Sequence, residues 1–428
     1  MRKSSRREFL RRLGAGAAML PSLTPALDLK DVLQPPNSAP EQLASDEAYW
    51  QQVQQAFNVD RSIIHLNSGG VCTTPNAVQR SMQSHQEYAY RVPFYVNRRN
   101  IRPQIASIRQ RLAASFGCET EEVALTRNTS EGMEICQLGY PLKAGDEVLT
   151  TTHDYPRMVN TWRQREQREE IVLKQVAIPI PLEHTQTIIE RFEQQITDRT
   201  RLIMICHIID LTGQVMPVKE IVAFARRRGI TVLVDGAQAF GHLAFTNHDL
   251  DCDFYATSLH KWIMGPPGTG MMFIRKNQIG SIWPLMPADA KQQHDIRKFE
   301  DIGTHPLSSL LAVSEALTFH ETIGPARKEA RLRYLRDYWA KELTSFDRVK
   351  CLTSNDPDFA VGLATIDIDG IPSKDLRDYL WNSHRIIVRP IDHPEVHGIR
   401  ISPGLHTTTH ELDRFIDVMR KVIKHGIA

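Results

Sequence analysis

The sequence of 428 residues has no long apolar run, no closely spaced cysteine pair and no strong net charge. No apolar run reaches the roughly 18 residues that a membrane-spanning helix requires, so we expect no membrane span. The six cysteines form no CxxC pair, so we expect no metal site. A formal net charge of +2 gives no electrostatic reason to expect nucleic acid as a partner.

Basic side chains are concentrated at the N-terminus, where residues 1–12 carry six of them and a single acidic one. The segment from Ser5 to Arg11 (SRREFLR) resembles the twin-arginine export signal of bacteria, and a weakly apolar stretch follows from Leu13 to Leu27. We therefore expect residues 1–27 to be a signal peptide for the twin-arginine export machinery, and the protein to be periplasmic or otherwise exported. A disordered basic tail is the alternative.

After this leader, helical and strand patterns alternate. Residues 28–60 are predicted to form a linker and a first helix near 41–57. From 61 to 323, short apolar strand patterns alternate with helical patterns, which predicts a large α/β domain with a mainly parallel sheet. A long charged helix then leads into a smaller α+β domain, predicted to span 324–428. Its predicted strands lie near 359–367, 386–389 and 399–402.

The most informative stretch is a buried-strand pattern, Val232 to Val234, that ends in the carboxylate of Asp235. In α/β sheets ligands bind beyond the carboxyl ends of the strands, so Asp235 indicates a binding site. Lys261 follows, between a strand pattern that ends at Ser258 and a glycine-rich turn. A lysine in such a place can be desolvated, which lowers its pKa and favours imine chemistry. Each residue alone has an ordinary explanation, as a helix cap or a surface lysine, but the combination predicts a site.

Both residues belong to a set of five motifs. These are His65 to Gly70 (HLNSGG), Thr126 to Gly132 (TRNTSEG), Asp235 to Gln238 (DGAQ), Ser258 to Lys261 (SLHK) and Arg400 to Pro403 (RISP). From about Ile64 to its end the chain thereby resembles the class V aminotransferase family of fold-type I pyridoxal-phosphate enzymes, which includes cysteine desulfurases and isopenicillin-N epimerase-like enzymes. The resemblance implies a large domain with a mainly parallel sheet, a smaller α+β C-terminal domain and a homodimer.

The resemblance also implies roles for individual residues. Lys261 is expected to hold pyridoxal 5'-phosphate as a Schiff base and to move protons at the α-carbon of the substrate. Asp235 is expected to pair with the pyridinium nitrogen of the cofactor, which keeps the ring an electron sink. Gln238 is expected to hydrogen-bond the phenolic oxygen of the ring.

A second group of residues is expected at the cofactor phosphate. Thr129 and Ser130 combine hydroxyls with backbone N–H groups at a predicted helix start, which suits an anion. Ser258 and His260 match positions that also contact the phosphate, with a turn hydroxyl and a packed imidazole as the ordinary alternatives. Thr304, after Gly303, resembles the residue that reaches the phosphate from the neighbouring subunit, so the site would be complete in a homodimer.

A third group is expected around the cofactor ring and the substrate. His153 occupies the place of the family's ring-stacking residue, with Tyr155 as the rival candidate. Arg400 is expected to bind the substrate carboxylate through two parallel hydrogen bonds, with a surface ion pair as the alternative. Asn67 is also expected to face the substrate.

The chain departs from the family pattern in two ways. Asp210 stands where family members often carry Asn. A carboxylate there would repel the cofactor's phenolate unless protonated or turned away, so Asp210 either alters the cofactor site or caps the next turn. In addition, no cysteine lies between Arg400 and Thr409. Persulfide chemistry requires a thiolate, which argues against a cysteine desulfurase.

Together these residues predict a pyridoxal-phosphate-dependent enzyme acting on an amino acid or amine. Transamination ranks first, and epimerisation or C–S lyase chemistry are the alternatives, because all three begin with loss of the α-proton. A non-catalytic binding protein that retains the fold is the alternative of another class. The presence of Lys261, Asp235 and the phosphate residues argues against it.

Overall fold

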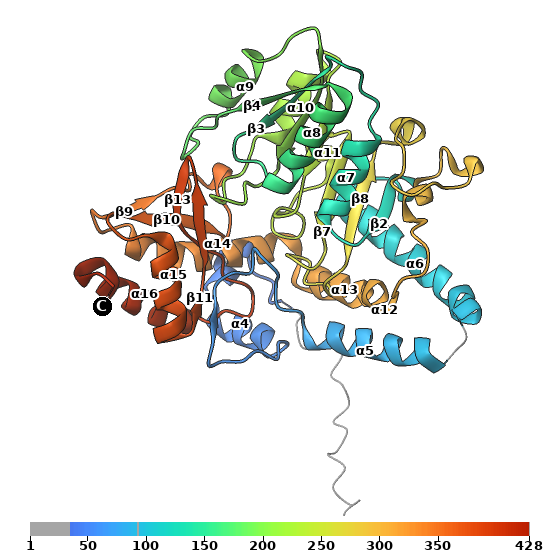
Figure 1. The fold of residues 1–428 in the computed structure, drawn as a ribbon. Coiled ribbons are helices and arrows are strands. Elements are labelled where there is room, and N and C mark those ends of the chain that lie inside the picture. Colours follow the sequence, from blue (N-terminus) through green and yellow to red (C-terminus); the bar gives the residue numbers. More distant parts are fainter. Residues whose placement is uncertain (1–34, 92–93, 428) are drawn as a thin grey trace, which may run out of the picture.

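The computed structural model describes residues 35–91 and 94–427, and the expected signal peptide, 1–27, lies outside the described residues. A large α/β part and a smaller α+β part lie side by side (Figure 1). The helix α14 (Pro325–Leu343) leads from the first into the second. This is the long charged helix that the sequence predicts, and it begins at a proline suited to the first helical position.

A seven-stranded sheet forms the centre of the large part, in the order β2-β8-β7-β6-β5-β3-β4. Only β8 runs antiparallel to its neighbours in this sheet; the other strands are parallel to one another, which confirms the predicted mainly parallel sheet. The strands are β2 (Val123–Thr126), β3 (Glu147–Thr151), β4 (Val172–Val176), β5 (Thr200–Cys206), β6 (Thr231–Asp235), β7 (Phe254–Ser258) and β8 (Gly270–Ile274).

Both faces of the sheet are covered, which explains the continuous apolar runs in its central strands. Successive side chains of a strand point to opposite faces. Accordingly, Leu202 and Met204 enter one hydrophobic cluster, whereas Ile203 and Ile205 enter another. The first cluster contains side chains of α7 (Thr129–Gly139) and α8 (Pro156–Glu169). The second contains side chains of α6 (Phe94–Phe116), α9 (Thr185–Glu193), α10 (Val218–Arg226) and α13 (Val313–Ile323).

The smaller part contains an antiparallel sheet in the order β12-β13-β10-β9. Its strands are β9 (Val349–Cys351), β10 (Ala364–Ile368), β12 (Arg389–His393) and β13 (Val396–Ile401). Helices α15 (Ser373–His384) and α16 (Thr409–His425) pack with α14 around a separate hydrophobic cluster. A short strand β1 (Ile64–His65) pairs with β11 (Ile386–Ile387), which ties the start of the large part to the smaller one.

The predicted helix at 41–57 is wrong in detail, because two short helices occupy this segment. They are α3 (Pro40–Ala44) and α4 (Glu47–Gln54). The side chain of Asp46 accepts a hydrogen bond from the backbone N–H of Tyr49 and so starts a new helix. The remaining helices are α5 (Asn76–Arg91), α11 (Asn247–Leu250) and α12 (Ser308–Leu311), with short 3₁₀ helices at Thr120–Glu122, Lys276–Ser281, Ala290–Gln292, Ile296–Glu300 and Pro357–Phe359.

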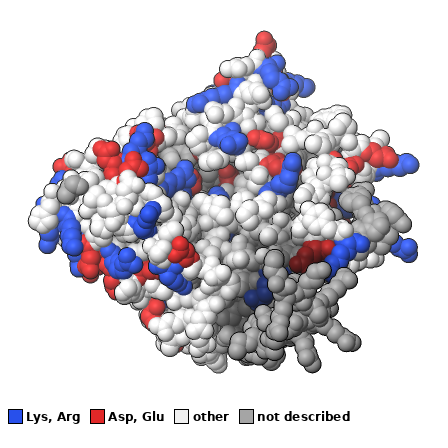
Figure 2. Space-filling model, turned by 60° about the horizontal axis from the view of Figure 1, so that its bottom comes forward, with Lys and Arg blue, Asp and Glu red and all other residues white. Residues whose placement is uncertain are grey.

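The surface mixes charges of both signs. On the face drawn in Figure 2, basic and acidic side chains are interspersed over the described residues. In the described part of the chain, no helix has both the length and the apolar composition needed to cross a bilayer.

Candidate active site

A cavity of about 450 Å³ opens at the carboxyl ends of the central strands. This is the edge of a parallel sheet at which ligands bind in α/β proteins. Nine of the predicted site residues line it: Thr129, Ser130, Tyr155, Asp210, Asp235, Gln238, Ser258, His260 and Lys261. Three further lining residues with ionisable side chains were not predicted as site residues: Arg157, Cys206 and Arg389.

Lys261 and Asp235 are both buried in the wall of this cavity, and burial shifts both pKa values. Burial lowers the pKa of the Lys261 ammonium group, although the carboxylates of Asp210 and Asp235 partly oppose this shift. Burial raises the pKa of Asp235 to about 6, against the hydrogen bond that its carboxylate accepts from the Ala237 N–H at 2.9 Å. The site therefore contains an amine, that of Lys261, which loses its proton readily. It also contains a carboxyl group, that of Asp235, whose ionised form a neighbouring cation would favour.

The start of helix α7, where an anion site is predicted, lines one part of the cavity. Asn128 caps this helix by accepting the N–H of Glu131 at 2.9 Å. At the first helical residue, the N–H of Thr129 donates to the Ser258 hydroxyl at 2.9 Å, and the two hydroxyls lie 2.7 Å apart. Backbone N–H groups and hydroxyls at a helix start are a suitable setting for a phosphate. The ring of His260 lies beside them, with Nδ1 3.2 Å from the Thr269 carbonyl oxygen.

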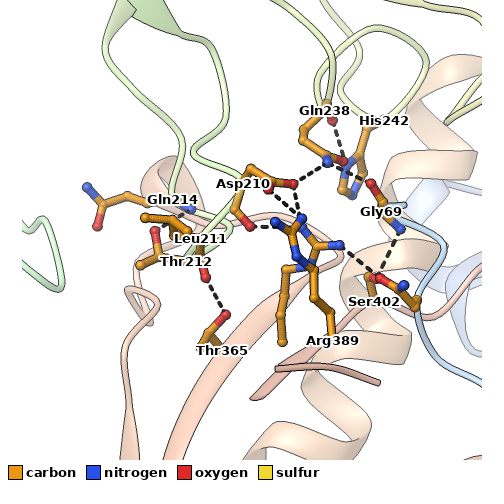
Figure 3. Close-up of polar contacts among 12 residues, drawn as sticks. Gly69, Asp210, Leu211, Thr212, Gln214, Gln238, His242, Thr365, Arg389 and Ser402 are labelled. Atoms are coloured by element: carbon orange, nitrogen blue, oxygen red, sulfur yellow. Dashed lines mark hydrogen bonds and ion pairs between the residues drawn. The ribbon is translucent and has the colours of Figure 1, made fainter. Parts of the chain in front are cut away.

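Gln238 is held by three hydrogen bonds. Its amide nitrogen donates to the carbonyl oxygen of Gly69 at 2.7 Å and to the Asp210 carboxylate at 2.8 Å (Figure 3). Its amide oxygen accepts the indole N–H of Trp262, the residue after Lys261, at 2.9 Å. Since both amide hydrogens are engaged, the predicted contact to the phenolic oxygen of a cofactor would replace or share one of these bonds.

Asp210 neither stays protonated nor caps a turn; it is an ionised partner of two arginines. Its carboxylate pairs with Arg389 and with Arg400. Burial opposes ionisation of Asp210, but the two guanidinium groups and Lys261 outweigh it and hold the pKa of this carboxyl below its usual range. Arg400 is fully buried and also binds Asn67, whose Oδ1 accepts from Nη2 at 2.9 Å. Neither Arg400 nor Asn67 lines the cavity, so their roles toward a substrate stay predictions.

The two candidates for ring stacking lie in different surroundings. Tyr155 precedes α8, is 37% exposed and lines the cavity. His153 is only 1% exposed and points to the smaller part of the protein, where its Nε2 lies 2.9 Å from Oε2 of Glu395. Of the two residues, Tyr155 is therefore the one placed to contact a ligand in the cavity. Stacking by either residue stays a prediction.

Thr304 lies away from the cavity of its own chain. It is exposed, and the neighbouring residue Gly303 lines a different cavity, together with Arg102 and Arg297. This placement is compatible with the expectation that Thr304 serves a neighbouring subunit.

The sequence contained a weak signal for the lining residues that were missed. Cys206 ends β5, at the edge of the sheet where ligands bind in α/β proteins, and Arg157 is the second residue of α8, the helix that follows β3. Arg389 begins β12, and its relation to the cavity depends on the pairing of that strand with β13.

The comparison with known families decides the assignment. The model of the family described as "Aminotransferase class-V" matches residues 64–415. The chain belongs to the class-V aminotransferase family. Members of this family depend on pyridoxal phosphate, and the fold is that of fold-type I pyridoxal-phosphate enzymes.

Individual relatives cover most of the chain. An isopenicillin N epimerase of Amycolatopsis lactamdurans is 26% identical over 394 residues, which span 88% of this chain and 99% of that protein. A probable cysteine desulfurase of Halalkalibacterium halodurans is 29% identical over 313 residues, or 70% of this chain and 71% of that protein. The solved structure of the cystine C-S lyase C-DES with cysteine persulfide has a TM-score of 0.76 and 24% identity, covering 84% of this chain and 97% of that one.

The residues of the cavity fit pyridoxal phosphate. The buried Lys261 has the lowered pKa that bond formation with an aldehyde requires. The α7 start and the Ser258 hydroxyl offer donors for a phosphate, and Asp235 offers a carboxylate for a ring nitrogen. All three groups line one cavity, so a single molecule with these three features can reach them.

Proposed function

We propose that the protein is an aminotransferase that acts on an amino acid or amine, with Lys261 as its base. The observation that carries this proposal is the position of Lys261. Its amine is buried in the wall of the cavity, and burial is the main cause of its lowered pKa. Pyridoxal phosphate, when bound, withdraws electrons from a linked amine and so acidifies the hydrogen on the neighbouring carbon.

A single base suits transamination. Lys261 can take the proton from the α-carbon of the substrate and return it to a neighbouring atom on the same face. Asp235 would stabilise a positive charge on the ring of the bound cofactor, because a nearby cation favours its ionised form. The start of α7 would hold the phosphate of the cofactor, which would keep the reacting atoms within reach of Lys261.

The thiols of the chain do not support cysteine desulfurase activity. Cys206 lines the cavity, but burial, Asp154 and Asp235 raise its pKa well above the usual value. A thiol in this setting is a poor nucleophile, since the thiolate is the reactive form. Burial also raises the pKa of Cys351 on β9.

Epimerisation is the second candidate function, and Tyr155 is the observation that favours it. An epimerase needs a second acid on the opposite face of the substrate, and a phenol in the cavity wall can serve. The isopenicillin N epimerases among the relatives match this chain over almost their whole length. C–S lyase chemistry stays the third possibility, since it begins with the same loss of the α-proton.

We also propose that the protein works as a homodimer and is exported by the twin-arginine route. The exposed position of Thr304, outside the cavity of its own chain, supports a site completed by a second subunit. The export proposal rests on the motif from Ser5 to Arg11. Changing Arg6 and Arg7 to Lys should retain the protein in the cytoplasm, and unchanged export would contradict this route.

The test of cofactor chemistry is spectroscopic. Purified protein should be yellow with pyridoxal phosphate, and borohydride should bleach the colour and fix the cofactor to Lys261. Lys261→Ala should abolish the absorbance, whereas the surface variant Lys276→Ala should keep it. If the wild-type protein takes up no pyridoxal phosphate, the hypothesis of a pyridoxal-phosphate enzyme is wrong, and a non-catalytic binding protein is favoured.

The type of reaction is separated by its products. Incubation with a panel of L- and D-amino acids in deuterated water should yield a keto acid in step with conversion of the cofactor to its amino form. Free ammonia or sulfide would instead indicate a lyase. Inversion of the substrate without keto acid, lost in Tyr155→Phe, would replace the transaminase by the epimerase.

A further inference from the structure

His242, in the segment after β6, is a buried histidine with three close partners. Its Nδ1 lies 3.0 Å from the backbone carbonyl oxygen of Gln238 (Figure 3). Its Nε2 accepts the backbone N–H of Gly362, which lies two residues before β10 in the smaller part of the protein, at 3.0 Å. Its ring stacks on the indole ring of Trp262, with centroids 3.7 Å apart and planes inclined by 27°. The side chain is only 1% exposed and does not line the cavity.

These contacts define the protonation state of the His242 ring. A carbonyl oxygen can only accept, so Nδ1 must carry the hydrogen that Gln238 receives, whereas Nε2 must be bare in order to accept from Gly362. Burial lowers the pKa of His242 well below its usual value, against the hydrogen bond to Gln238, and neighbouring basic side chains add to the shift. The ring is therefore neutral, with one donor and one acceptor, and both are used.

Trp262 extends the effect of His242 to the side-chain amide of Gln238. The indole N–H can only donate, and at 2.9 Å it binds the amide oxygen of Gln238. The amide nitrogen must then point the other way, toward the carbonyl oxygen of Gly69 and the carboxylate of Asp210. Both of these residues line the cavity. The stacked indole ring therefore determines that the amide presents its donors, and not its acceptor, to the cavity.

We propose that His242 is a positioning residue for the cofactor ring. It holds the backbone of Gln238 directly and the amide of Gln238 through Trp262, and so aims the amide N–H groups at the phenolic oxygen of pyridoxal phosphate. Its bond to Gly362 anchors this arrangement on the smaller part of the protein. The inference rests on pyridoxal phosphate as the cofactor and on the predicted contact of Gln238, and it holds whichever reaction follows.

The test compares two compounds that differ only at the phenolic oxygen. Pyridoxal phosphate and its deoxy analogue, in which hydrogen replaces the phenolic hydroxyl, are each dialysed to equilibrium against the full chain freed of cofactor. The dissociation constant of the analogue divided by that of pyridoxal phosphate measures recognition of the phenolic oxygen. His242→Phe keeps a flat ring against Trp262 but loses both hydrogen bonds. It should lower this ratio about fivefold, because one hydrogen bond to the cofactor is then misaligned.

A second substitution tests whether His242 acts through Gln238. Gln238→Ala removes the amide and should lower the ratio by a similar factor. In that background His242→Phe should lower it no further, because changes that act through one contact are not additive. His242→Asn retains a donor for the Gln238 carbonyl oxygen but has no ring to stack on Trp262, so it should lower the ratio by a smaller factor.

His406→Phe is the matched control. This histidine is also buried, but it stacks on His65, with ring centroids 5.5 Å apart, instead of on Trp262. The variant should keep the wild-type ratio, whatever its melting temperature.

A histidine that only packs the core would give a different pattern. His242→Phe would then weaken binding of both compounds by the same factor and leave the ratio unchanged, which would overturn the inference. An unchanged ratio in Gln238→Ala, or a further fall in the double variant, would overturn it as well. If His242→Phe does not fold, an unchanged ratio in His242→Asn decides against the inference in the same way.

These failures differ from a failure of the proposed function. In each of them pyridoxal phosphate still binds to the wild-type protein, so the proposed function stands. If the wild-type protein binds neither compound, the proposed function itself fails, and the inference fails with it.

Discussion

Glu395, at the tip of the β12–β13 hairpin, shares a hydrogen bond of 2.9 Å with Nε2 of the buried His153 in the turn after β3. The Glu395 carboxylate also accepts the Thr152 hydroxyl at 3.0 Å. The hairpin that carries Arg389 and Arg400 is thus attached at its tip to the large part of the protein.

The contact predicts a pH-dependent stability. Burial lowers the pKa of His153, and Glu395 only partly opposes the shift. In the unfolded chain the imidazole binds a proton near pH 6.5, but in the folded protein it does not, so acidification through this value favours unfolding. Glu395→Gln removes the carboxylate that favours the proton and should increase the loss of stability below about pH 6.5, by up to roughly 1 kcal/mol.

Thermal unfolding of the two proteins above and below this pH measures the effect. In a His153→Asn background, Glu395→Gln should show no added pH dependence. A Glu395→Gln protein that loses less stability in acid than the wild type would contradict the assigned sign.

Removal of the Ser258 hydroxyl is expected to lower the affinity for the cofactor. This hydroxyl is the acceptor for the first N–H of α7 and lies 2.7 Å from the Thr129 hydroxyl. Ser258→Ala removes one polar group from the predicted phosphate end and should weaken pyridoxal phosphate binding by about tenfold. Titration of cofactor-free protein with pyridoxal phosphate gives the constant. Ser281→Ala, which removes an exposed turn hydroxyl, should leave it unchanged.

A side chain at Gly236, the residue after Asp235, is expected to disturb the packing of the core. A Cβ atom at this position would lie 2.0 Å from Cζ of Tyr255, a fully buried residue of β7. Gly236→Ala should therefore cost about 1–3 kcal/mol of unfolding free energy, as overpacking does in well-filled cores. Denaturant unfolding measures this cost. Tyr255→Leu makes room for the methyl group, so the double variant should lose less than the two single losses combined; simple additivity would count against the clash.

The cofactor residues could be predicted from the sequence because each follows a distinctive strand. The apolar runs that end at Asp235 and Ser258 are buried on both faces, and the carboxyl ends of neighbouring parallel strands meet at one edge. Motif residues that follow these strands therefore lie close together at that edge of the sheet. Lys261 and Thr129 come next to the same cavity for this reason.

The surroundings of these residues could not be predicted, because they depend on partners distant in sequence. The direction of His153 is set by Glu395, 242 residues away, and that of Asp210 by Arg400, 190 residues away. A local pattern contains no information on such pairs. Strand β4 (VLKQV), at the edge of the sheet, is also hard to predict, since its mixed composition follows no clear apolar period.

A second pH dependence of stability, of the same sign but at higher pH, is expected from Lys328, which lies beneath the active-site turn. This lysine of α14 is buried, donates to the carbonyl oxygen of Trp262, and lies 3.4 Å from Nδ1 of His320. Burial lowers its pKa to about 7. Between about pH 7 and pH 10 the unfolded chain therefore binds a proton that the folded protein releases, so this lysine makes stability rise with pH in that range.

Lys328→Met removes the titrating group. Relative to the wild type, the variant should be most stable at or below pH 7, where the wild type carries a buried charge, and this advantage should shrink toward about pH 10. Denaturant unfolding at a series of pH values measures the difference, and Lys341→Met, which alters a side chain that is 80% exposed, should show no such trend. A constant difference between Lys328→Met and the wild type would mean that Lys328 stays protonated in the fold, its charge held by the Trp262 carbonyl.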